Sequence, residues 1–254
     1  MRTLVRPLVD DLRAKNAKYV EFRPLNPAVP IPSGFSESQH FYFHQVDLRP
    51  QVEILFSNLH KNSFQRKVHR ALRERISYEK GASPSLVEKF YKLFVMTRRR
   101  HGLPPPPISW LVNLLGCLGS AIQVRIASME GRPVAGMVTL VHKASITYKY
   151  GGSDMRFNNA GGMALLFWNM MLEAKAEGME VLDLGRCDAD NEGLITYKDR
   201  LGSTRSMLTY WRSPRVKLRP TTPDWKFRVV KRIFGYMPDP IRVGVGKVLY
   251  PHVG

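Results

Sequence analysis

Apolar residues recur along the chain with the periods of helices and strands, most regularly from Ser83 onward. Leu86, Phe90, Leu93 and Phe94 are spaced as one face of a helix, and Ser83 is a typical residue to begin it. The pattern then predicts a short helix over 108–118, strands over 121–129, 133–142 and 145–151, a long helix over 161–177, a strand over 181–184, a helix over 191–201 and a strand over 206–211. This order is typical of an α/β (α+β) fold, a mixed sheet with helices packed on it.

The part of the chain before residue 81 has fewer elements. The same periods predict a helix over 4–17, a strand over 18–23, a loop over 24–38, a strand over 41–48 and a basic helix over 60–75. These elements can bury only a thin core. We therefore expect residues 1–80 to form a reduced unit beside the larger one over 81–213.

The helix over 60–75 has two unlike sides. Its apolar side carries Phe64, Val68, Ala71 and Leu72, and its opposite side carries the cations Lys61, Arg66, Lys67, Arg70 and Arg73 with hardly any acid among them. Like charges at helical spacing repel one another unless an anion offsets them. The cationic side is either a solvated surface or a phosphate-binding surface, and the sequence leaves both readings open.

Charge narrows the possible partners. The chain has 39 Lys and Arg against 21 Asp and Glu, a formal net charge of +18, which favours nucleic acid, an acidic protein or an anionic membrane surface as partner. Its two cysteines, Cys117 and Cys187, indicate neither a disulfide scaffold nor a metal site. No segment reaches the roughly 18 apolar residues of a membrane span, and the amino terminus lacks a secretory apolar region. These features predict a cytoplasmic location, with possible contact at the inner membrane face.

Residues 214–254 form a basic tail in which apolar and cationic residues are mixed. Segments 225–236 and 241–250 have the pattern of amphipathic helices. The tail is either an arm packed against the larger unit or a helix that lies on a membrane or on a partner.

Several motifs between residues 55 and 213 resemble one family in their order and spacing. They are the run Tyr148-Lys-Tyr-Gly-Gly-Ser-Asp154, then Asn158, Asp183-Leu-Gly-Arg186, Gly193-Leu-Ile-Thr-Tyr-Lys198 and Leu201-Gly202. Together they resemble the carboxyl-terminal GNAT lobe of FemAB-like transferases. Residues 97–104 and the basic helix resemble a subgroup associated with exosortase and exopolysaccharide loci. The resemblance implies a GNAT-like mixed sheet flanked by helices over 81–213 and a partial first GNAT-like lobe over 1–80.

The resemblance also implies a reaction. Members of this family transfer an acyl or aminoacyl group to an amine of a peptidoglycan precursor, so we expect an N-acyltransferase of the cell envelope or of exopolysaccharide synthesis, whose acceptor can be lipid-linked. The expected co-substrate is acyl-CoA, an acyl carrier protein or aminoacyl-tRNA, with no bound cofactor and no metal. The alternative is a non-catalytic basic module that binds nucleic acid or an anionic membrane.

Candidate residues follow from these motifs. By resemblance, Lys198 contacts donor phosphate and is assigned to catalysis together with Asp183; the alternatives are an exposed lysine and a salt bridge between Asp183 and Arg186. Gly161 and Gly162 either present backbone amides to phosphate or simply start a helix. The full donor-binding set is Lys198, Arg186, Asn159, Gly161, Gly162, Lys67 and Arg70. The expected acceptor-binding set is Arg99, His101, Tyr148 and Tyr150. Alternation on a strand would place both tyrosine rings on one face, where they either line a substrate groove or fill a core.

Overall fold

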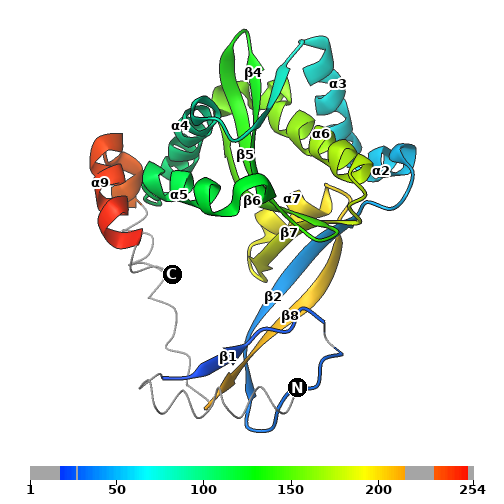
Figure 1. Ribbon diagram of the computed structural model, residues 1–254, viewed down its shortest axis with the longest axis vertical. Helices are drawn as coiled ribbons and strands as arrows, with labels where there is room; N and C mark the ends of the chain where they lie inside the picture. The colour runs from blue at the N-terminus through cyan, green and yellow to red at the C-terminus, as the bar shows by residue number, and fades with distance from the viewer. Residues whose placement is uncertain (1–17, 27, 215–231, 251–254) are drawn as a thin grey trace.

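A single eight-stranded sheet organises the part of the chain that the computed structural model describes, residues 18–26, 28–214 and 232–250. The strand order is β1-β8-β2-β7-β6-β5-β4-β3 (Figure 1). The strands are β1 (Val20–Phe22), β2 (Ser36–Asp47), β3 (Ser77–Gly81), β4 (Ile122–Met129), β5 (Arg132–His142), β6 (Ser145–Ser153), β7 (Val181–Asp188) and β8 (Thr204–Ser213). The helices are α2 (Val52–Asn58), η1 (Lys61–Gln65), α3 (Arg66–Arg73), α4 (Pro84–Arg100), α5 (Ile108–Leu118), η2 (Gly119–Ala121), η3 (Met155–Ala160), α6 (Gly162–Ala176), α7 (Glu192–Asp199) and α9 (Asp239–Leu249).

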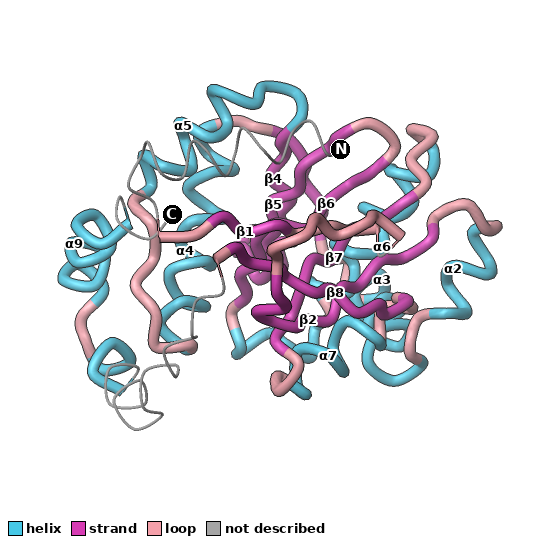
Figure 2. Tube along the Cα trace, turned by 90° about the horizontal axis from the view of Figure 1, so that it is seen from below, coloured by secondary structure: helices cyan, strands magenta, loops and turns pink. Residues whose placement is uncertain are grey.

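Helices cover both faces of the central strands. On one face α6, α3 and α2 bury a core that includes Leu166, Phe167 and Met170. On the other face α4 and α5 bury a second core around Phe90, Ile122 and Val138. Figure 2 shows the two groups of helices on opposite sides of the strands. The mixed α/β architecture predicted from the sequence is therefore confirmed. No helix in the described ranges is long and apolar enough to cross a membrane.

The pair β6 and β7 is the parallel pair of this sheet, and it is short. Only three residue pairs join the two strands, from Ser145↔Val181 to Thr147↔Asp183. Beyond them β6 continues along β5, whereas β7 continues along β2. Helix α6 connects the two strands and crosses one face of the sheet, as a parallel connection requires. The sheet consequently splits between β6 and β7 after Asp183.

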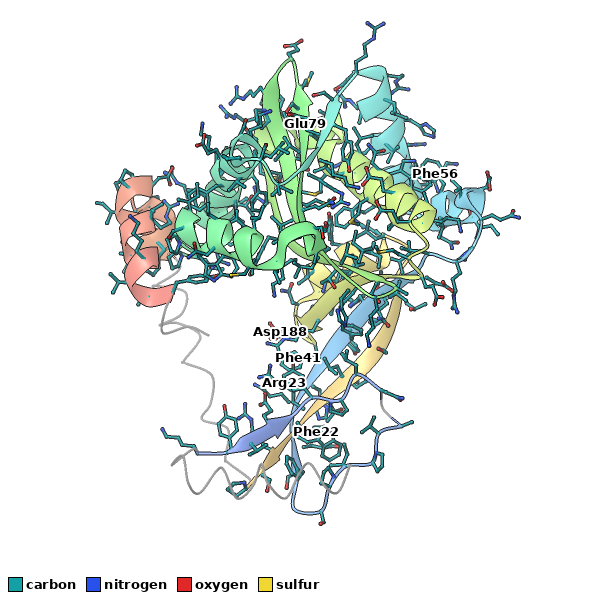
Figure 3. The ribbon with its side chains drawn as sticks, viewed as in Figure 1. Phe22, Arg23, Phe41, Phe56, Glu79 and Asp188 are labelled. Carbon is teal, nitrogen blue, oxygen red and sulfur yellow. The ribbon has the colours of Figure 1, made fainter. Side chains whose placement is uncertain are left out.

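Strand β2 joins the amino-terminal part of the chain to the rest of the sheet. It lies between β7 and β8 and is antiparallel to both. Phe41, Phe43, Leu208 and Tyr210 form a small buried cluster where β2 meets β8, and Figure 3 shows Phe41 beside Asp188 on this arm of the sheet. The division into lobes at residue 80 stays a prediction; in the structure, strands from both sides of that position share one sheet.

Most elements expected from the sequence are present, with boundaries that differ by a few residues. β2 begins at Ser36, inside the predicted loop, and β7 continues to Asp188, because each is held by backbone pairing to a distant strand rather than by apolar periodicity. The sequence missed α2 and β3. The predicted helix over 60–75 divides into a π-helical start and α3, and Leu72 is 59% exposed rather than buried.

The helices predicted near the two ends of the chain have different outcomes. The helix expected over 4–17 lies outside the described residues, as does most of 225–236, of which residues 232–236 are helical. The helix expected over 241–250 is present as α9. It packs against the proline-rich loop that precedes α5, where Gly246 approaches Pro105 so closely that a Cβ atom would lie 2.0 Å from the carbonyl oxygen.

Close packing of α4 on β6 leads to a stability prediction. A Cβ atom on Gly152 would lie 2.7 Å from backbone atoms of Leu93 and Phe94, so Gly152→Ala should lower the free energy of unfolding by about 1–3 kcal/mol. Gly116 lies in α5 with open space around it, and Gly116→Ala should raise that free energy by about 0.5–1 kcal/mol. Urea denaturation of both variants tests the opposite signs; equal effects would contradict the packing.

Candidate active site

A cavity of about 710 Å³ opens beside the end of β6, beyond the pairing of β6 with β7. Its wall comes from five regions: the helix over 61–73, the end of α4, the last part of β6 with η3, the start of α6, and α7. The lining residues are Ser63, Phe64, Lys67, Thr97, Arg100, His101, Tyr148, Gly151, Gly152, Ser153, Met155, Asn158, Gly161, Met163, Ala164, Asn191, Gly193, Leu194 and Tyr197. The part of β6 that lies beyond its pairing with β7 therefore borders a space large enough for a substrate.

The cavity is electropositive. Lys67, Arg100 and His101 contribute to its wall, and none of the described residues that line it is acidic. Lys67 Nζ lies 3.3 Å from the Asn158 carbonyl oxygen, and Arg100 Nη1 lies 3.4 Å from that of Ser153. These contacts hold the two cations at the wall. An anionic group entering the cavity would meet positive charge without a competing carboxylate.

The start of α6 adds backbone donors to this wall. Gly161 caps the helix in the left-handed conformation, with φ 88° and no side-chain cap. The first N–H groups of a helix lack partners within it and attract anions. Gly161 also approaches Lys67 closely, since a Cβ atom would lie 2.2 Å from the Lys67 carbonyl oxygen. Gly161 thus brings α3 and α6 together at the cavity, whereas Gly162 packs against Val134 and Ala135.

The two tyrosines of β6 lie on opposite faces of the sheet, so the expectation of a shared face was wrong. The register of β5 and β6 shifts between Thr139↔Tyr148 and Val138↔Tyr150, which leaves Lys149 as an extra residue. Such a bulge reverses the alternation of side chains. Tyr148 packs on Phe167 and lines the cavity, and its burial raises the pKa of the hydroxyl to about 12.

Tyr150 instead contacts Phe94 and Trp110 on the face covered by α4 and α5. Burial also raises the pKa of its hydroxyl to about 12. It does not line the cavity described above, and its surroundings are those of a core residue.

Lys198 is buried behind the cavity rather than exposed in it. Its ammonium donates to the carbonyl oxygens of Gly185 and Arg186, both at 2.9 Å, and burial lowers the pKa of Lys198. Asp183 accepts a hydrogen bond of 2.6 Å from the Gly185 backbone N–H, and burial raises the pKa of its carboxyl group. Together the two side chains hold the backbone of β7 where it leaves β6. The geometry gives them a structural position, and their catalytic roles stay predictions.

The other predicted residues separate into distinct places. Arg186 donates to the Tyr210 hydroxyl and lies over the Phe41 ring at 4.3 Å, so the salt bridge expected with Asp183 is not formed. Arg70 pairs with Glu74 at 2.6 Å. The structure brings Lys67, His101, Tyr148 and Gly161 together in the cavity wall; Asn159, Gly162, Arg70, Arg186, Lys198, Asp183, Arg99 and Tyr150 do not line it.

A second cavity of about 550 Å³ adjoins the first and contains Arg99. Four arginines line it, namely Arg99, Arg100, Arg156 and Arg232, together with Tyr236 and a single carboxylate, Asp154. Arg100, Ser153 and Met155 belong to both cavities. The arginine run at 98–100 signalled this region in the sequence, but the contributions of Arg156 and Arg232 depend on how distant segments meet.

A cluster near β7, in which Cys187 and His44 are buried, contains the residue types of covalent catalysts. Cys187 Sγ lies 3.5 Å from His44 Nδ1, and His44 Nε2 lies 3.2 Å from Asp199 Oδ1. Burial raises the pKa of the Cys187 thiol and lowers that of His44, which favours the neutral forms of both groups. Neither residue lines the cavity. The described residues include no cluster of His, Cys, Asp or Glu suited to a metal ion.

The mixed sheet with helices on both faces is that of a GNAT-like fold, and the family match below makes the chain an acyltransferase. Residues 60–199 match the family described as Acetyltransferase (GNAT) domain, which covers more than half of the chain. The protein belongs to this family. No curated protein matches the chain significantly.

Solved structures resemble this fold over most of its length. FemX is similar with a TM-score of 0.70 and 12% identity, covering 91% of this chain and 78% of that one. The C-terminal domain of a putative lysylphosphatidylglycerol synthetase from Agrobacterium fabrum has a TM-score of 0.62, 13% identity and coverage of 84% and 73%. L-PGS from Bacillus licheniformis has a TM-score of 0.60, 13% identity and coverage of 92% and 78%. At these identities the likeness shows a FemX-like GNAT fold.

The position of Lys198 predicts a stability effect. Lys198→Met leaves the carbonyl oxygens of Gly185 and Arg186 without their charged donor, so the free energy of unfolding should fall by about 1.5–3 kcal/mol. Lys92→Met, at an exposed position of α4, is the matched control and should change it by less than about 0.5 kcal/mol. Urea denaturation measures both. Unchanged stability in Lys198→Met would favour a purely ligand-binding lysine.

Asp154 predicts a dependence of stability on pH. A hydrogen bond from Arg156 lowers the pKa of the Asp154 carboxyl group, which also accepts from the Arg156 backbone. Because the folded-state pKa is the lower one, the stabilisation is complete above the unfolded pKa of about 3.9 and is lost as pH falls through the folded value. Asp154→Asn should thus be less stable than the parent at neutral pH, and the difference should shrink in acid.

Urea denaturation between neutral pH and acid measures this difference. Glu88→Gln, at an exposed position of α4, serves as the control for loss of a carboxylate. A constant difference between Asp154→Asn and the parent across the range would show that the Arg156 contact does not act through ionisation.

Proposed function

We propose that the protein transfers an acyl or aminoacyl group from an anionic donor to an amine in the cavity beside β6. The observation that carries this proposal is the split between β6 and β7, which leaves backbone of β6 beside a cavity with Lys67, Arg100 and the start of α6 in its wall. A phosphate of the donor binds the start of α6 and Lys67. The acyl arm extends along β6 toward the split.

The reaction requires a neutral amine, an oriented carbonyl carbon and hydrogen-bond donors for the oxyanion of the tetrahedral intermediate. The amine forms a bond to the carbonyl carbon, and the bond to the leaving sulfur or oxygen then breaks. Tyr148 is protonated at neutral pH, since the pKa of its hydroxyl is about 12, and can donate a proton to the leaving group. His101 lines the same cavity and is the candidate to accept the proton of the amine.

We infer that the acceptor belongs to the cell envelope. FemX and the lysylphosphatidylglycerol synthetases share the fold of this chain, and the motif resemblance concerns envelope and exopolysaccharide precursors. Acyl-CoA, an acyl carrier protein and aminoacyl-tRNA are the candidate donors, because each presents phosphate or other negative charge to a basic cavity. A precursor amine, carried on a lipid or free, is the candidate acceptor.

A non-catalytic basic module is the rival function. The four arginines of the second cavity favour it, because a cationic surface can bind an anionic partner without catalysing a reaction. Turnover separates the two functions. Acyl transfer to an amine, followed by mass spectrometry of the acceptor, supports the enzyme, whereas binding of donor or nucleic acid without any product supports the module.

Lys67→Met tests the donor site. Loss of a charge-assisted phosphate contact should raise the KM for the donor about 10–100-fold with little change in kcat. Lys92→Met, which lines neither cavity, is the control. Thermal shift first selects acetyl-CoA or aminoacyl-tRNA as the donor that binds. Steady-state kinetics with that donor then measures both variants. An unchanged KM in Lys67→Met would remove Lys67 from the donor site.

A further inference from the structure

Helix α5 presents an uncharged surface. Residues 103–124, which include all of α5, contain no charged side chain and no histidine. Leu111 and Leu115 face the core, while Val112 is 52% and Leu118 is 39% exposed. Surface helices of water-soluble domains usually carry charges on the outer side. The outer side of α5 therefore lacks the charged residues that face water elsewhere in this molecule.

Helix α9 adds an apolar outer side next to α5. Its inner side is defined by Arg242, which is fully buried and donates to the Phe234 and Met237 carbonyl oxygens, and by Gly246 against Pro105. Its outer side exposes Ile241 by 56% and Val248 by 68%. The apolar residues thus face solvent although the helix is packed on the domain.

The two helices adjoin each other at one end of the molecule. The rings of Trp110 on α5 and Tyr250 after α9 lie 5.7 Å apart, and Figure 1 shows α9 beside α5. Helical residues 232–236 add Ile233, 56% exposed, and Tyr236, 78% exposed. The exposed apolar and aromatic residues of these two carboxyl-terminal helical segments, Ile233, Tyr236, Ile241 and Val248, together with the uncharged α5 beside α9, are here called the α5–α9 surface.

Cations border this surface. Arg232 and Tyr236 line the second cavity together with Arg99, Arg100 and Arg156, and Lys247 is exposed on α9. The acid of α9, Asp239, lies 2.9 Å from Arg242 and is offset by it. Apolar residues beside positive charge are typical of helices that lie in the interface of an anionic bilayer, where Tyr is also enriched.

We propose that the α5–α9 surface docks on the surface of an anionic lipid bilayer. The exposed apolar residues enter the boundary of headgroups and acyl chains, and the bordering cations attract the acidic headgroups. A second copy of this chain fits less well, because two chains of net charge +18 repel each other. Nucleic acid would match the cations but would leave the apolar side of α9 in water.

Docking in this way has a consequence for the cavities. The second cavity contains Arg232 and Tyr236 from the docked segment, and it shares Arg100 with the first cavity. The bilayer would thus lie next to the first cavity, whose wall contains Lys67 and Tyr148. The docking proposal itself does not depend on the reaction, since it rests on exposure and charge alone.

Vesicle co-sedimentation of the full chain tests the proposal. Vesicles of phosphatidylcholine mixed with an equal amount of phosphatidylglycerol should bind the protein, more weakly as salt is added, and pure phosphatidylcholine should bind it poorly. Ile241→Ser combined with Val248→Ser should lower the affinity for the anionic vesicles by at least about tenfold, because two exposed aliphatic side chains no longer enter the bilayer.

The matched control places the same change elsewhere. Leu72→Ser combined with Met207→Ser removes two residues that are 59% and 56% exposed on α3 and β8, and this variant should bind as the parent does. Thermal melting checks that both double variants are folded. Retained binding in the α9 variant, equal loss in the control, or absence of binding by the parent would overturn the proposal.

Analytical ultracentrifugation identifies the competing occupant. The proposal expects the same sedimentation coefficient for the parent and for the α9 double variant in the absence of lipid. A parent that sediments as a dimer, with a monomeric α9 variant, would show that a second copy covers the surface and would overturn docking on lipid.

Discussion

The separation of β7 from β6 is the constraint on which the site depends. Two parallel strands that part after three residue pairs leave backbone groups without a strand partner, and such groups are costly when buried. The Asp183 carboxylate accepts a hydrogen bond from the Gly185 N–H, and the Lys198 ammonium donates to the carbonyl oxygens of Gly185 and Arg186. A half-buried carboxylate and a buried ammonium thus stabilise the bend that opens the sheet. The pKa shifts of both groups, each caused by burial, are a consequence of this position.

Close backbone approaches shape the cavity on the other side of the split. Gly152 lets β6 lie against the backbone of α4, and Gly161 lets the start of α6 lie against the carbonyl group of Lys67. Both glycines line the cavity. The same approaches bring cations from the helix over 61–73 and from the end of α4 to one wall. Packing and electrostatics are therefore coupled here, since the residues that allow close contact also assemble the anion-attracting surface.

Positive charge is distributed over several surfaces with different neighbours. Arg98 donates to the Pro104 carbonyl oxygen, and Arg125 is buried beside Glu173, so these two cations serve the fold. Lys67 and Arg100 face a cavity whose described lining residues include no acid. Arg232 and Lys247 accompany the exposed apolar residues of the α5–α9 surface. Net charge alone predicts an anionic partner, and the neighbours of each cation determine which partner it suits.

The sequence by itself determined the order of elements from α4 to β8, because their apolar periodicity is local, and it placed Lys67, His101, Tyr148 and Gly161 in a candidate site. It missed the extent of β2, which is held between β7 and β8 by pairing with residues far along the chain. It placed the rings of Tyr148 and Tyr150 on the same face of the sheet, because the pattern of alternating residues gives no sign of the bulge at Lys149. Only the tertiary structure decided that Lys198 is buried and that Arg99 belongs to a second cavity. Burial and convergence depend on contacts between distant segments, and periodicity carries no information about these contacts.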